Sequence, residues 1–228
     1  SIAKAVDLSR FEKYAEECRQ FFEKADYEQS QIMVLSAIGQ IFTLLKNFDK
    51  AVDSINQANR IVEKIGITNI PPAFYLYFLL SEFRHFLSRS IDLVPTEDKT
   101  EYNEIMKRLS KIEKAANSAS RKSAVHNTEF NRLKAIYQWF KNNQKKALKW
   151  FDKSIKEGER LGARPDLSRT YMEVGKRLME PKSRYKHLNG ITANEYLEKA
   201  KVLFEEMDLQ WDLEQLEKVK RGEQVPIV

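Results

Sequence analysis

One apolar pattern occurs twice in this chain, 96 residues apart, and its spacing is that of a helix. The first copy comprises Ala51, Ile55, Ala58 and Ile65-Gly66, and the second comprises Ala147, Phe151, Ser154 and Leu161-Gly162. In each copy, residues three and four positions apart share one helix face, and a glycine follows the last turn. Such internal repetition predicts a protein built from repeated helices.

The composition favours an all-α fold. The 228 residues include only seven glycines and six prolines, which is few for the tight turns of a strand-and-hairpin protein. Apolar residues recur at helical spacing along most of the chain, which predicts about ten helices. The expected ranges are 9–25, 29–46, 48–65, from 72 past 86, 97–116, 128–142, 145–161, 165–180, 192–207 and 209–221. The polar stretch 117–123 is the best candidate for a loose connection.

Neighbouring helices are expected to pair as hairpins. In the first pair, Gly39 and Ala51 are small residues that let two backbones approach, while Phe42 and Ile55 fill the space beside the crossing. The other first-helix positions of this pair are Leu35 and Ile38, and Phe48 lies in the turn. A second pair has Phe130, Leu133 and Tyr137 as large residues, with Lys134 where a small one is expected. A third pair has Tyr171, Val174-Gly175 and Leu178 with Ala193, Leu197 and Ala200.

These positions resemble the tetratricopeptide repeat over most of its ~34 residues. The resemblance implies a superhelix of antiparallel helix hairpins, a tetratricopeptide-like α-solenoid, that forms one domain over residues 1–228. It also implies a concave groove lined by the first helix of each pair, where ligands bind.

A closer resemblance covers residues 146–213. The segments that carry this resemblance are 147–151, 159–165, 171–178 and 204–213. They look like the C-terminal region of large bacterial signalling proteins that join a class III nucleotide cyclase or a regulatory ATPase module to a tetratricopeptide array. The resemblance implies a C-terminal fragment of a larger polypeptide, acting as its non-catalytic sensor or partner-binding end.

By position, the exposed residues of the implied groove are Gln40, Arg132, Arg169 and Lys176. Three of the four are cationic, so the groove is expected to bind a protein or an acidic peptide through charge-assisted hydrogen bonds. Other domains of the same polypeptide are further candidate partners.

Two alternatives use the same basic region. Residues 101–190 hold 22 Lys or Arg and 10 Asp or Glu, a local charge of +12. Aromatic residues lie among the lysines there (Trp139, Phe140, Trp150 and Phe151 beside Lys141, Lys145, Lys146 and Lys149), as in proteins that bind single-stranded nucleic acid. Core packing of these rings is favoured, and nucleic acid is the less favoured partner. The second alternative is a closed helical bundle that recognises a phosphorylated peptide through Arg132, Arg169 and Lys176.

The sequence contains no pattern of an enzyme or a metal site. There is no glycine-rich phosphate loop and no HExxH, and His85, His126 and His187 lie in distant segments. His85 is expected to be a packed, hydrogen-bonded residue. We therefore expect no catalytic residue, metal or cofactor.

The sequence also bears on the compartment. The single cysteine, Cys18, allows no internal disulfide and is expected to pack as a small apolar residue. The longest apolar run, 73–80, is too short for a membrane span. Together these features predict a soluble, cytoplasmic protein.

Overall fold

The computed structural model describes residues 13–14, 16–18, 20–21, 27–93 and 99–227. Most of these residues are helical and only four lie in strands, so the prediction of an all-α fold is confirmed. The chain divides into two compact units, residues 1–122 and 123–228. The prediction of one continuous domain stays a prediction.

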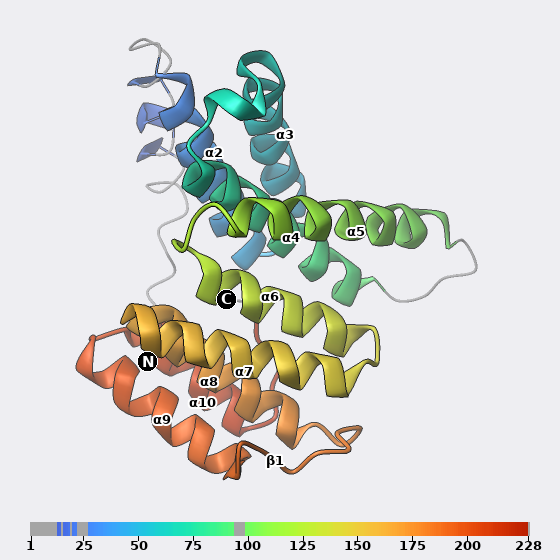
Figure 1. The fold of residues 1–228 in the computed structure, drawn as a ribbon, viewed down its shortest axis with the longest axis vertical. Coiled ribbons are helices and arrows are strands. Elements are labelled where there is room, and N and C mark those ends of the chain that lie inside the picture. The colour runs from blue at the N-terminus through green and yellow to red at the C-terminus, as the bar shows by residue number, and fades with distance from the viewer. Residues whose placement is uncertain (1–12, 15, 19, 22–26, 94–98, 228) are drawn as a thin grey trace. The chain divides into compact units, whose positions relative to one another are not determined.

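The first unit contains four described α-helices and one short 3₁₀-helix. They are α2 (Glu28–Leu44), α3 (Phe48–Ile65), η1 (Ile67–Asn69), α4 (Pro72–Asp92) and α5 (Thr100–Ser120). Helix α4 packs against α2, α3 and α5, and α2 pairs with α3 (Figure 1). Leu76, Leu80 and Phe83 on α4 are fully buried, as expected for the most apolar helix of the chain.

The second unit contains five α-helices and a two-residue hairpin. They are α6 (Asn127–Phe140), α7 (Gln144–Leu161), α8 (Arg164–Met179), β1 (His187–Leu188), β2 (Ile191–Thr192), α9 (Ala193–Glu206) and α10 (Gln210–Lys220). Consecutive helices contact one another from α6 to α10, and α8 also contacts α6 and α10 (Figure 1). The two strands pair antiparallel, with His187 opposite Thr192 and Leu188 opposite Ile191.

The predicted helix ends are confirmed where the sequence carries a chemical signal. Gly66 and Gly162 follow α3 and α7 with φ of 80° and 64°, a backbone region that side-chain-bearing residues rarely adopt. A capping box is present at the start of α9: Thr192 accepts from the Glu195 backbone N–H, and the Glu195 carboxylate accepts from the Thr192 backbone N–H.

The close approach predicted for the paired helices is also confirmed. A Cβ built on Gly39 would lie 2.9 Å from Ile55 Cγ1 across the α2–α3 pair. One built on Gly175 would lie 3.0 Å from the Ala193 carbonyl oxygen across the α8–α9 pair. Real Cβ atoms rarely come so close, so glycine sets both helix separations.

Three expectations from the sequence are wrong or fall outside the described residues. Helix α5 continues to Ser120, so most of the predicted connection 117–123 is helical. Cys18 is exposed, not packed. The predicted helix over residues 9–25 is described only at isolated helical positions between 13 and 21.

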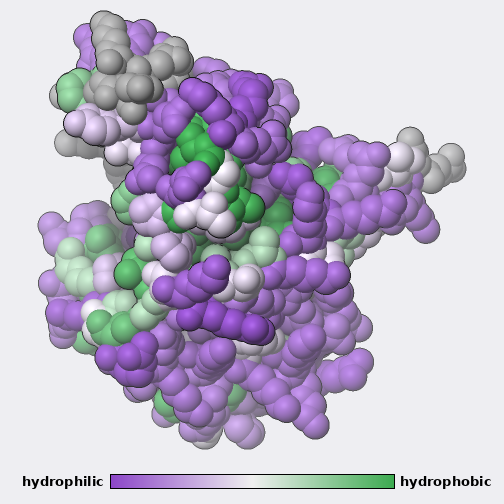
Figure 2. Space-filling view, turned by 45° about the horizontal axis from the view of Figure 1, so that its top comes forward, coloured by the Kyte–Doolittle hydropathy of each residue, from purple (hydrophilic) through white to green (hydrophobic). Residues whose placement is uncertain are grey.

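The surface of the visible face is mostly hydrophilic, with hydrophobic residues in separate patches (Figure 2). Within the part of the chain that the structure describes, no helix has both the length and the apolar character needed to cross a bilayer.

Candidate functional site

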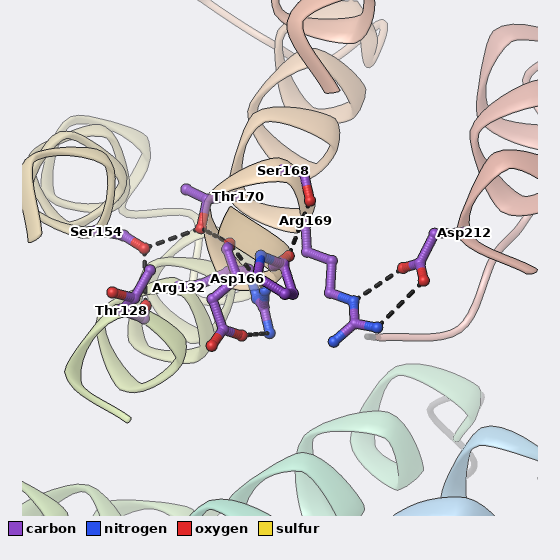
Figure 3. Close-up of polar contacts among 9 residues, drawn as sticks. Thr128, Arg132, Ser154, Asp166, Ser168, Arg169, Thr170 and Asp212 are labelled. Carbon is purple, nitrogen blue, oxygen red and sulfur yellow. Dashed lines mark hydrogen bonds and ion pairs between the residues drawn. The ribbon is translucent and has the colours of Figure 1, made fainter. Parts of the chain in front are cut away.

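Arg132 does not lie on an exposed groove, which corrects the expectation from the sequence. Its side chain on α6 is only 1% exposed. Nη1 donates to the Asp166 carbonyl oxygen at 3.2 Å, and Nη2 lies 3.5 Å from Asp166 Oδ1 at the start of α8 (Figure 3). The buried guanidinium joins α6 to α8 and is closed to a partner.

Arg169 is committed to a contact inside the second unit. Its Nε and Nη2 donate to the two carboxylate oxygens of Asp212 on α10, at 2.8 and 3.1 Å (Figure 3). This fork geometry is the strongest form of an arginine–carboxylate pair, and Asp212 is buried. Arg169 therefore joins α8 to α10.

Lys176 and Gln40 are also partly buried. The Lys176 ammonium lies 3.9 Å from Glu173, and burial lowers its pKa while Glu173 raises it. Gln40 belongs to the first unit, whereas the three cations belong to the second. The four predicted groove residues are therefore not brought together within one unit.

A polar contact joins α6, α7 and α8 where the second copy of the repeat has a serine in place of alanine. Ser154 donates to the Thr128 carbonyl oxygen at 2.7 Å, and its Oγ lies 2.9 Å from Thr170 Oγ1 (Figure 3). The substitution keeps a small side chain at the crossing and adds hydrogen bonds to both neighbours.

The exposed positive charge of the second unit gathers elsewhere, around one open cleft. We call it the basic cleft. It has a volume of about 830 Å³ and lies between the first half of α7 and the loop after α8. Its cations are Lys145, Lys146, Lys149, Lys153 and Arg184, with Trp150 and Tyr185 as its aromatic residues.

The cations of the basic cleft make no ion pair with a described carboxylate, although, besides Arg160, Lys153 is near enough to Glu157 on α7 to contribute to the lowering of the pKa of that carboxyl. No carboxylate lines the cleft, and none of its five cations has a described carboxylate within the 4.0 Å of an ion pair. The four lysines fall at helical spacings on α7, where like charges repel one another. An anion in the cleft would relieve this repulsion.

Gln144 fixes the shape of the basic cleft. This side chain is 6% exposed in the first turn of α7. Its Nε2 donates to the Lys182 carbonyl oxygen at 2.9 Å, and its Oε1 accepts from the Arg184 backbone N–H at 2.9 Å. One buried amide thus ties the loop to the helix and places Arg184 opposite the lysines.

Most of the aromatic residues near the lysines are buried or already in contact with other side chains. Phe151 is fully buried, and Trp139 is 1% exposed with its Nε1 donating to Glu180 at 2.8 Å. The ammonium groups of Lys134 and Lys153 lie 3.8 and 4.9 Å from the Trp150 ring centroid. Lys134, the residue that departs from the repeat pattern, thus packs over an aromatic ring.

Sequence reasoning singled out three of the five cations, Lys145, Lys146 and Lys149. Lys153 follows Lys149 by four residues, so helical spacing could have added it. Nothing in the sequence could have added Arg184, because its position depends on the contacts of Gln144.

Among the described residues, no group of three or more His, Cys, Asp or Glu side chains could hold a metal ion. His85 has the packing role expected of it: it is 3% exposed, and its Nδ1 lies 3.3 Å from Thr43 Oγ1.

No protein-family profile, curated protein or solved structure matches this chain.

Proposed function

We propose that this chain is a non-catalytic interaction module whose second unit binds an acidic segment of a protein partner in the basic cleft. The observation that carries the proposal is the set of five cations around one cleft without a described carboxylate partner. Exposed ammonium and guanidinium groups that converge on a concave surface form charge-assisted hydrogen bonds with carboxylates. The ligand class is the one expected from the sequence, but its site differs from the predicted groove.

An acidic peptide fits the cleft better than single-stranded nucleic acid does. Stacking of bases needs free aromatic faces, and two ammonium groups already lie over the Trp150 ring. Tyr185 is the other aromatic residue of the cleft. Carboxylates need only the cations.

The scaffold is proposed to be a tetratricopeptide-like array. Two features support this: glycines at the helix crossings of α2–α3 and α8–α9, and contacts of each helix with its neighbours within a unit. A role as the regulatory end of a larger bacterial signalling polypeptide is part of the same proposal and rests on the resemblance of residues 146–213.

Binding of a fluorescein-labelled hexaglutamate peptide, measured by anisotropy at several salt concentrations, tests the function. We expect the double variant Lys146→Glu with Lys149→Glu to weaken binding at least tenfold, since a hydrogen bond to a charged group contributes about 1.5–3 kcal/mol. Both residues are exposed, and Lys146 lies in the first turn of α7, where the helix dipole favours glutamate, so the fold should be retained.

The matched control is Lys156→Glu with Arg160→Glu, which makes the same total charge change on α7 outside the cleft, at cations paired with Asp152 and Glu157. An equal loss in the control would mean that only net charge matters and would contradict the proposal. A single-stranded oligonucleotide of equal charge that binds more tightly than the peptide would overturn the choice of partner.

A further inference from the structure

The first unit contains a second cleft, independent of the basic cleft. It has a volume of about 400 Å³ and is lined by α3, η1, α4 and α5. Helix α4 packs against both α3 and α5 and contributes four of the lining residues. The volume is in the range of pockets for small molecules, roughly 300–1,000 Å³. We call this second cleft the α4 cleft.

The walls of the α4 cleft are mainly apolar. They are formed by Val62, Ile67, Tyr75, Phe78, Leu79 and Ile112. Most of these side chains are buried, and Tyr75 and Phe78 form a stacked pair with ring centroids 6.3 Å apart. Such a surface suits a flat apolar body.

A buried carboxylate lies among these apolar residues. Glu82 on α4 is 3% exposed and lines the cleft. Arg108 on α5 donates to it through Nε at 2.6 Å and through Nη2, and both bonds end on Oε1. Oε2 accepts no hydrogen bond from the described residues, so one acceptor is left for a ligand.

The cleft has spare donors beside this acceptor. Lys111 lies three residues after Arg108 on α5, lines the cleft and has no described carboxylate at ion-pair distance. The Arg108 side chain is 37% exposed and uses only two of its N–H groups on Glu82. An acceptor and donors thus lie side by side.

The charges of the α4 cleft balance. Its ionisable lining residues are Glu63, Glu82, Arg108 and Lys111, besides Tyr75. Burial raises the pKa of Glu82, although Arg108 and Lys111 lower it, so the carboxylate lacks full compensation for its lost hydration. A donor on the ligand would supply that stabilisation, whereas a net charge on the ligand would find no excess of opposite charge.

We propose that the α4 cleft binds a small uncharged molecule that has a flat apolar ring and a carboxamide-type edge. The N–H of that edge donates to Glu82, and its carbonyl oxygen accepts from Lys111 or Arg108. The ring packs against Tyr75 and the apolar walls. This site does not depend on the proposed function of the second unit.

Three fragments that share one ring test the ligand class: benzamide, benzoate and benzylamine. Each is titrated into the full chain at pH 7 and followed by ¹H–¹⁵N correlation spectra. We expect benzamide to shift amide signals around the α4 cleft and to bind at least threefold more tightly than the other two. A tighter anion or cation, or no shift with benzamide, would overturn the proposal.

Two variants place the fragment in the cleft. Glu82→Gln keeps the shape but replaces a carboxylate oxygen by an NH₂ group, and we expect at least a fivefold loss of benzamide affinity. Ala115→Leu adds bulk to the cleft lining on α5, where leucine is a good helix former, and should abolish the shifts even if Glu82→Gln destabilises the unit.

The control is Glu101→Gln, which makes the same change at an exposed residue of α5 that pairs with Arg89 outside the cleft. It should bind benzamide as the parent chain does. Unchanged affinity in both cleft variants would show that the fragment binds elsewhere and would refute the site.

Discussion

The contact between α8 and α9 depends on the absence of a side chain at position 175. A Cβ there would lie 2.6 Å from Leu197 Cδ2 and 3.0 Å from the Ala193 carbonyl oxygen. The leucine can rotate, but the carbonyl belongs to the backbone of α9 and can move only with the helix.

We therefore expect Gly175→Ala to destabilise the protein by about 1–3 kcal/mol, the usual cost of overpacking, despite the better helix propensity of alanine. Urea denaturation followed by circular dichroism measures the change. Gly158→Ala is the matched comparison, because its closest new contacts are side-chain atoms at 3.1 Å. A larger loss at Gly158 than at Gly175 would contradict the argument.

His85 makes stability depend on pH. Burial lowers its pKa from 6.5 to about 4, and Arg89 contributes to the lowering. The unfolded chain therefore binds this proton more readily than the folded one. The contribution of His85 is complete above pH 6.5 and is lost as the pH falls towards 4.

When the pH is lowered from 7.5 to 5, protonation of His85 in the unfolded chain should reduce the free energy of unfolding by about 2 kcal/mol. Urea titrations at the two pH values measure the loss, and His85→Gln should remove this part of it. The exposed His187→Gln serves as the control and should leave the loss unchanged. The idea fails if His85→Gln shows the same pH dependence as the parent chain.

At the scale of elements, α7 shows what periodicity can and cannot predict. Its small residues Ala147 and Ser154 are buried, as the 96-residue repeat predicts, and its lysines lie on the opposite, solvent-exposed face. The amphipathic pattern fixes which face is buried, because burial of apolar side chains drives packing. The pattern does not predict that the loop 181–186 lies beside the lysines and forms a cleft with them. That arrangement depends on the hydrogen bonds of Gln144 to the loop.

Helix ends were predictable to the extent that residue chemistry marks them. The bounds of α3 were predicted correctly, since Gly66 stops the helix. Helix α5 runs four residues beyond the expected end and includes Asn117, Ser118 and Ser120. Small polar residues favour turns locally, but packing of Ala116 and Ala119 overrides that preference.

At the scale of the whole molecule, residues 123–228 have their own set of buried side chains, among them Leu133, Phe151, Val174 and Phe204. We expect this segment, expressed alone, to keep its helical circular dichroism and to unfold cooperatively in urea. A shorter segment, 164–228, lacks the α6–α7 pair and should not unfold cooperatively. Loss of cooperative unfolding in 123–228 would show that the unit needs the rest of the chain.

Local periodicity and the chemistry of single residues were enough to predict that this protein is helical, where most helices lie and which glycines let them approach. Which cations can bind a partner depends on how the helices pack. Arg132 and Arg169 look like groove residues in the sequence, but Asp166 and Asp212 from other helices bind them. The lysines of the basic cleft have no carboxylate at ion-pair distance among the described residues. Whether a charge is compensated depends on residues distant in the chain, so spacing alone cannot reveal it.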